Sequence, residues 1–187
     1  MRKSLLALLL AIALVAPVFA ADEGTMELDI KAGFNVMSSG EVRISEDIDP
    51  AFTAGLDFFY YVMPEFAIGA GVSYVFNSEV ANSAGTKIGW TNLYAQAKYV
   101  FDLGDDLFNN IYPLIQVGYG IVRFDPDNID IDSNGLYWGI GVGTTIKECV
   151  VFELLYSNGN ATVKTGPGTA DLKYKTIQLK VGYKFSF

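Results

Sequence analysis

Hydrophobic and polar residues alternate with a period of two along most of the chain. In 26–36 the even positions carry apolar residues, whereas the odd positions carry polar residues and one glycine. Successive side chains of a β-strand point to opposite faces, so this period predicts a strand with one apolar face. The same pattern recurs in eight segments, which are 26–36, 52–62, 66–76, 90–101, 115–122, 136–146, 150–157 and 174–187. No stretch has helical spacing of comparable strength, so the sequence predicts an all-β fold.

The connections between these segments alternate in length. Those at 63–65 and 147–149 are short, and the one at 102–111 is intermediate. The other four connections, which follow the first, third, fifth and seventh segments, span about ten to fifteen residues each. Long loops at one end and short turns at the other are typical of outer-membrane barrels. The pattern therefore predicts an eight-stranded antiparallel up-and-down transmembrane β-barrel.

Two kinds of eight-stranded barrel fit the alternation, and they differ in which face points outward. A soluble lipocalin-like barrel has its apolar face inside, whereas a membrane barrel has it against lipid. Ten of the 19 glycines share the face that carries the charges: Gly33, Gly55, Gly69, Gly71, Gly118, Gly120, Gly139, Gly141, Gly143 and Gly182. Because an eight-stranded lumen is narrow, we expect the glycines to lie inside and the bulky residues outside. Aromatic residues also gather near both ends of the segments, as the two membrane interfaces favour.

The first residues of the chain have the features of an export signal. Two basic residues precede the apolar run 5–16, and Val18 and Ala20 place small residues at the two positions that a signal peptidase reads. A membrane-spanning helix needs about 20 apolar residues, and Pro17 interrupts this shorter run. We therefore expect a cleaved secretory signal peptide over 1–20 and an outer-membrane β-barrel domain over 21–187, exported through the periplasm to the cell outer membrane.

Composition removes several classes of function. The chain has no histidine, which excludes catalytic arrangements and metal sites that need an imidazole. Its net charge of -8 argues against binding to nucleic acid, which requires clustered basic residues. The single cysteine, Cys149, is either a free thiol or an intermolecular disulfide partner. We expect no enzymatic activity and no cofactor.

Charged residues on the predicted inward face are balanced in sign. They are Glu27, Asp29, Asp57 and Glu153 against Lys31, Lys98, Lys180 and Lys184. An isolated buried charge is costly, so we expect these groups to pair and to plug the lumen. The alternative is a selective ion path, since rings of charge also tune pores.

Two stretches carry a resemblance to a known family. Residues 180–187, with the sequence KVGYKFSF, have a polar residue, a glycine two positions later and a final phenylalanine, and glycine alternates with larger residues in 113–120 and 139–143. Over 26–187 the chain resembles the small outer-membrane β-barrel family that includes the OmpA transmembrane domain and OmpX-like proteins. The resemblance implies an assembly signal of Lys180, Gly182, Phe185 and Phe187, read by the barrel-assembly machinery. No peptidoglycan-binding domain is expected after the barrel.

One predicted loop has part of a metal-binding pattern. Asp130, Asp132, Asn134 and Gly135 match the first half of an EF-hand calcium loop. The match then fails, because the twelfth position is Gly141 instead of a bidentate glutamate. We therefore expect a solvated acidic loop without a tight metal site, with weak contacts to lipopolysaccharide through divalent cations.

Three functions fit these features. The first is structural: a barrel that supports membrane integrity and displays its loops at the cell surface. The second is a narrow porin-like channel for ions or small hydrophobic molecules, and the third is an adhesin that acts through the long loops. Outer-membrane lipid and lipopolysaccharide are the expected partners. A closed barrel has no free edge that demands a second subunit, so we expect a monomer.

Overall fold

The computed structural model describes most of the chain after the expected signal peptide. The described residues are 23–41, 45–47, 50–79, 87–104, 107–125, 133–165 and 168–187. The expected signal peptide at 1–20 lies outside them. No helix among these residues is long and apolar enough to cross a membrane.

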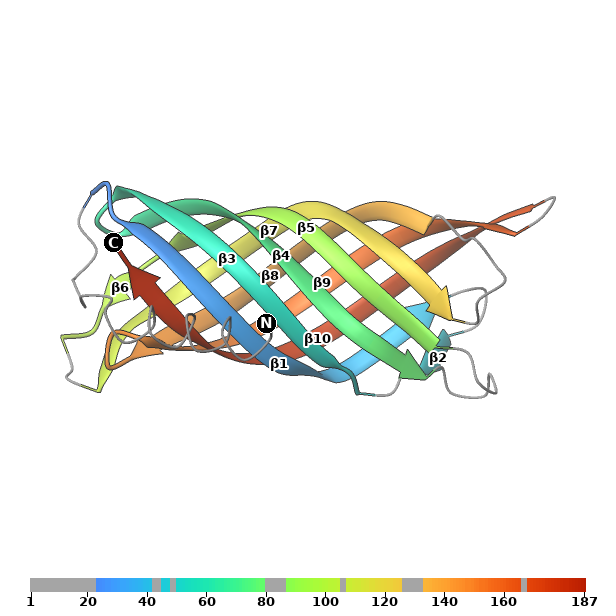
Figure 1. Cartoon of the computed structure of the whole chain (residues 1–187), viewed down its shortest axis with the longest axis horizontal. Helices are drawn as coiled ribbons and strands as arrows, with labels where there is room; N and C mark the ends of the chain where they lie inside the picture. The colour runs from blue at the N-terminus through green and yellow to red at the C-terminus, as the bar shows by residue number, and fades with distance from the viewer. Residues whose placement is uncertain are drawn as a thin grey trace, which may run out of the picture.

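Eight long strands form a closed antiparallel barrel (Figure 1). In ring order they are β1 (Met26–Glu41), β3 (Phe52–Met63), β4 (Phe66–Glu79), β5 (Lys87–Tyr99), β7 (Phe108–Asp125), β8 (Ser133–Ile146), β9 (Val150–Thr165) and β10 (Gly168–Ser186). Two short strands, β2 (Ser45–Asp47) and β6 (Phe101–Asp102), pair with β1 and β7. Each long strand pairs with its neighbour in sequence, and β10 closes the ring on β1. The predicted up-and-down barrel is therefore confirmed.

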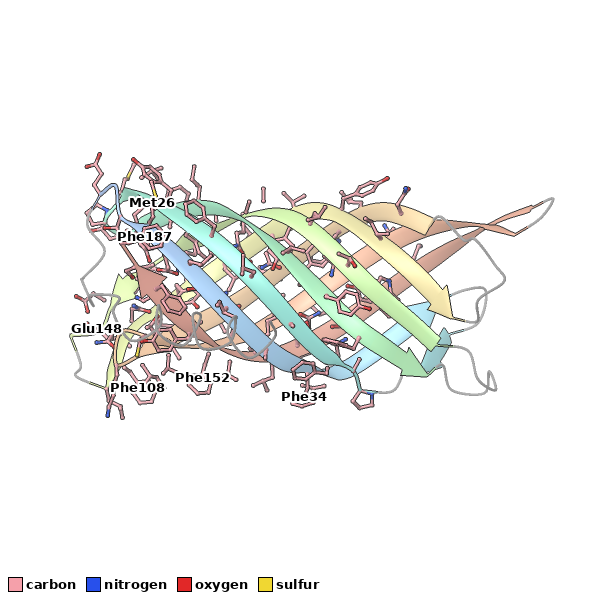
Figure 2. All side chains as sticks on the ribbon, in the orientation of Figure 1. Met26, Phe34, Phe108, Glu148, Phe152 and Phe187 are labelled. Carbon is pink, nitrogen blue, oxygen red and sulfur yellow. The ribbon has the colours of Figure 1, made fainter. Side chains whose placement is uncertain are left out.

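The seam between the first and last strands is paired along its length. The β1–β10 ladder runs from Glu27 opposite Ser186 to Glu41 opposite Lys173. One step beyond it, the amide of Met26 donates to the carbonyl of Phe187 at 2.9 Å, and the amide of Phe187 donates to the carbonyl of Met26 at 3.0 Å. Figure 2 shows these two residues together at the end of the barrel that carries the short turns. Because the seam is closed, the ring leaves no unpaired edge there.

The strands are longer than the alternating segments at the end opposite the short turns. β1 continues to Glu41 and β4 to Glu79, and β9 and β10 stay paired as far as Thr165 opposite Gly168. Their hairpin projects beyond the rest of the barrel in Figure 1. The predicted loop lengths of about ten to fifteen residues are therefore wrong for the connections after β4, β7 and β9, whereas the connection after β1, at 42–51, agrees with the prediction. Backbone hydrogen bonds hold the ladder together beyond the apolar band, where the alternation of side chains stops.

The apolar face points outward along the strands. In β3, Phe58 and Tyr60 are exposed, whereas Phe59 and Tyr61 are buried inside. The labelled side chains of Phe34 and Phe152 project away from the ribbon in Figure 2. Buried polar residues from every long strand line the interior. This arrangement confirms the membrane-barrel prediction and excludes the lipocalin-like alternative, which requires the opposite orientation.

Candidate functional site

The interior of the barrel contains the predicted charges, and its centre is organised around Lys31. The ammonium group of Lys31 lies 2.8 Å from Asp57, 2.5 Å from Glu153 and 3.3 Å from Asp29. These side chains come from β1, β3 and β9, and all four are almost fully buried. We call Lys31, Asp29, Asp57 and Glu153 the central cluster. One ammonium group thus contacts three carboxylates inside the barrel.

Two tyrosines complete the central cluster from other walls. The hydroxyl of Tyr94 in β5 donates to Asp57 at 2.8 Å, and the hydroxyl of Tyr112 in β7 donates to Glu153 at 3.0 Å. Both phenol rings are buried. Each hydrogen bond passes over one intervening strand of the ring, so the cluster joins walls that are not neighbours.

A second charged pair lies between the central cluster and the short-turn end. Lys98 in β5 forms an ion pair with Glu27 in β1, and Tyr61 donates a hydrogen bond of 2.9 Å to the same carboxylate. The Lys98 ammonium group also lies 3.9 Å from the centroid of the Phe59 ring, within the range of a cation–π contact. Two strands lie between β1 and β5 in the ring, so this pair spans much of the lumen.

Uncharged side chains fill the lumen on the other side of the central cluster. Gln116 donates to Gln96 at 3.0 Å and accepts from the hydroxyl of Tyr137 at 2.8 Å. The rings of Tyr137 and Tyr94 are in contact, with centroids 5.5 Å apart. This layer links β5, β7 and β8 above the charges.

The layer nearest the long hairpin is an aromatic bar across the barrel. Trp90 in β5 stacks on Tyr174 in β10, with ring centroids 4.3 Å apart and planes at 19°. Three strands separate β5 from β10 in either direction around the ring, so the two rings come from opposite walls. Asn92 adds a hydrogen bond of 3.3 Å to the Tyr174 hydroxyl. Both rings are buried, and together they cross the lumen.

Three glycines of the inward face lie against these rings. A methyl group at Gly143 would overlap the phenol of Tyr112, one at Gly71 would overlap Tyr94, and one at Gly159 would overlap Tyr174. The expectation that bulky residues lie only on the outside is therefore wrong. Glycine on one wall makes room for an aromatic ring from another. Among the described residues, the narrow lumen holds seven buried rings: Phe59, Tyr61, Trp90, Tyr94, Tyr112, Tyr137 and Tyr174.

The other two predicted lumen lysines are placed differently from Lys31 and Lys98. Lys180 is buried in β10 opposite Glu153 in the strand register, and Lys184 is half-buried opposite Asp29. Among the residues that the structure describes, no carboxylate lies within 4.0 Å of either ammonium group. The ion pairs therefore use two of the four lysines.

The remaining predicted residues are spread over the molecule. Gly182 lies in β10 against Lys31, and Phe185 pairs with Leu28 across the seam. Of the loop candidates, Asp130 and Asp132 lie outside the described residues, whereas Asn134 lies in β8 opposite Thr162. The described residues contain no group of three acidic, histidine or cysteine side chains placed to hold a metal ion.

Sequence comparison identifies the family. The family described as outer membrane protein beta-barrel domain matches residues 5–185. The chain belongs to this family. No curated protein sequence matches it.

Solved structures agree with the family at the level of the fold. The chain is similar to neisserial surface protein A, with 14% identity, a TM-score of 0.58 and coverage of 87% of this chain and 100% of that one. It is also similar to Ail, the attachment invasion locus protein of Yersinia pestis, with 17% identity, a TM-score of 0.51 and coverage of 87% and 99%. The outer membrane protein AlkL matches with 16% identity, a TM-score of 0.51 and coverage of 91% and 94%. Identities this low support a shared fold alone. The role of this family member has to be inferred from its own residues.

Proposed function

We propose that this outer membrane protein has a structural role and supports membrane integrity. Its lumen is plugged, so the protein acts through its outer surface and its loops. The observation that carries the proposal is the set of contacts across the lumen. Lys31 joins carboxylates from β1, β3 and β9, and the stacked rings of Trp90 and Tyr174 bridge β5 and β10. Hydrophilic solutes need a continuous water-filled path, and these side chains occupy the space such a path would use.

The plug also supports a mechanical function. The contacts of Lys31 with Glu153, of Lys98 with Glu27 and of Trp90 with Tyr174 link strands that the backbone ladder does not join, so the wall is braced from inside as well as around its circumference. Buried charges that are paired and hydrogen-bonded resist separation, because removing one partner leaves the other uncompensated. The outer apolar face provides the contact with lipid, and we propose lipopolysaccharide and the barrel-assembly machinery as the partners of a monomeric barrel.

Adhesion is a second candidate, and the β9–β10 hairpin favours it. This hairpin projects beyond the barrel rim in Figure 1, with strands paired as far as Thr165 and Gly168. The paired strands extend the wall beyond the rim, as a contact surface away from the membrane requires. Ail, one of the similar structures, is named as an attachment invasion locus protein. Loss of cell or matrix binding on deletion of the hairpin tip, with the barrel still folded, would support this role.

Planar-bilayer recording of the purified, folded protein tests the structural proposal. We expect no reproducible unit currents from the wild type. A triple variant, Lys31→Ser with Trp90→Ala and Tyr174→Ala, removes contacts from both the central cluster and the aromatic bar and serves as the positive control for insertion and detection. Unit currents from the wild type, at a level near that of the triple variant, would contradict the plug and favour the channel.

A further inference from the structure

Two aspartates of the central cluster lie directly opposite each other on neighbouring strands. Asp29 in β1 pairs with Asp57 in β3 in the antiparallel register, and their side chains are 0% and 1% exposed. Side chains at directly opposed positions have β-carbons about 4.5–5.5 Å apart, and like charges there are destabilising. Two buried carboxylates that share one site do not both ionise readily, because each raises the energy of the other's charged form.

The two aspartates have unequal partners. Asp57 accepts from the Tyr94 hydroxyl at 2.8 Å and lies 2.8 Å from the Lys31 ammonium group. Neither carboxyl oxygen of Asp29 accepts a hydrogen bond from the described residues, and its nearest cation, Lys31, is at 3.3 Å. A buried carboxylate without hydrogen bonds is costly, whereas a protonated carboxyl group carries no charge to stabilise.

Within the central cluster itself, one ammonium group contacts three carboxylates. The titratable groups near Asp29 and the rest of the central cluster are Glu27 and Lys31 of β1, Asp57 and Tyr61 of β3, Tyr94 and Lys98 of β5, Tyr112 of β7, Glu153 of β9, and Lys180 and Lys184 of β10. Lys98 is paired with Glu27, and Lys31 is shared among three carboxylates. Neither Lys180 nor Lys184 comes within 4.0 Å of a carboxylate of the described residues. One added proton would reduce the excess negative charge of the cluster.

We propose that Asp29 binds this proton, so that Asp29 and Asp57 form a carboxylic acid and carboxylate pair inside the folded barrel. The proton is taken from solvent during assembly and bonds to one carboxyl oxygen of Asp29. Asp57 keeps its negative charge and its contacts with Lys31 and Tyr94. The site is therefore a proton-binding site in the lumen, and it does not depend on whether the barrel conducts.

Infrared difference spectroscopy tests the proposal directly, because a protonated carboxyl group has a C=O stretching band that a carboxylate lacks. We would use the folded protein in a detergent without carbonyl groups, with isotope-labelled aspartate to identify the residue type. At neutral pH the wild type is expected to show one aspartic acid band, which Asp29→Asn removes and the exposed control Glu148→Gln leaves in place. Absence of the band from the wild type, or its persistence in folded Asp29→Asn, would overturn the proposal.

A pH titration gives a second readout, and its band measurement needs only the wild type. A carboxyl group that holds its proton more tightly when folded than when unfolded stabilises the fold at low pH, and this contribution is lost as pH rises through its folded-state titration. We therefore expect the resistance to unfolding to decline as pH rises from about 4, the usual titration range of an unfolded aspartate, and to level off where the aspartic acid band disappears. Asp29→Asn should lose this decline, whereas Glu148→Gln should keep it. A wild-type band that does not change with alkaline pH, or a decline that Asp29→Asn retains, is the contrary result.

Discussion

Gly143 lies directly against the phenol ring of Tyr112 on the neighbouring strand, and no side chain larger than hydrogen fits between them. The ring is thereby placed so that its hydroxyl reaches Glu153 at 3.0 Å, over the intervening strand β8. The absence of one side chain thus positions a hydrogen-bond donor for the central cluster. The backbone of β8 is close enough to Tyr112 to fix its ring.

Gly143→Ala should destabilise the barrel, because the added methyl group has to displace the Tyr112 ring. Overpacking of this kind costs about 1–3 kcal/mol. Reversible unfolding in detergent or lipid vesicles, followed by gel mobility, gives the change in the free energy of unfolding. Gly55→Ala is the matched control on the same inward face, since a β-carbon there makes only ordinary contacts, the nearest at 3.4 Å. Equal effects of the two substitutions would show that the ring contact is not the cause.

Lys31→Met should be among the most destabilising single substitutions in the barrel. It keeps the aliphatic volume but removes the ammonium group that contacts Asp29, Asp57 and Glu153. Removing one partner of a buried ion pair costs about 3–5 kcal/mol. The exposed lysine Lys173 provides the control, and Lys173→Met should change the free energy of unfolding by less than about 0.5 kcal/mol. A small effect of Lys31→Met would mean that the carboxylates are neutralised without it.

The period-two alternation was sufficient to predict the strands and their faces, because every second side chain of a strand shares one environment. It did not predict which inward groups meet. Lys98 and Glu27 contact each other across two intervening strands, and such a contact depends on the tilt of the strands and on the register of the whole ring. Tyr112 was missed for a local reason. It lies before Pro113, a residue that is rare inside strands, and the predicted segment began only at 115.

The stack of Trp90 on Tyr174 should show coupling in a double-mutant cycle. Trp90→Leu and Tyr174→Leu each remove one ring of the pair, and the loss in the double variant should be smaller than the sum of the single losses. The expected coupling is about 0.5–1.5 kcal/mol, as for other aromatic pairs. Tyr61 lies at the other end of the lumen, so Trp90→Leu and Tyr61→Leu should be additive. If the stability losses of the Trp90 and Tyr174 substitutions were additive, the stacking of the two rings would not stabilise the barrel.

Ile140→Lys should be costly because the residue lies on the outer face near the middle of β8, where it is 54% exposed. A lysine at the midplane of the bilayer costs about 2–4 kcal/mol, and the cost falls to about 0–1 kcal/mol near the interfaces. Leu103 is 51% exposed in the connection after β6, at the short-turn end. Leu103→Lys should therefore be mild when unfolding is measured in lipid vesicles. Similar costs at the two positions would contradict a bilayer midplane near Ile140.

Phe187→Ala separates assembly from stability. The backbone of Phe187 exchanges two hydrogen bonds with Met26, and a side-chain substitution leaves these bonds in place. If the aromatic side chain is read by the assembly machinery, the amount of protein in the outer membrane should fall several-fold in cells, while the refolded variant unfolds within about 1 kcal/mol of the wild type. Phe101→Ala is the control, because Phe101 is also an exposed aromatic residue at the short-turn end but lies outside the assembly signal. If Phe187→Ala lowered both stability and the amount of protein in the membrane, the side chain of Phe187 would act by stabilising the barrel wall. Normal amounts of Phe187→Ala in the outer membrane would count against its role in the assembly signal.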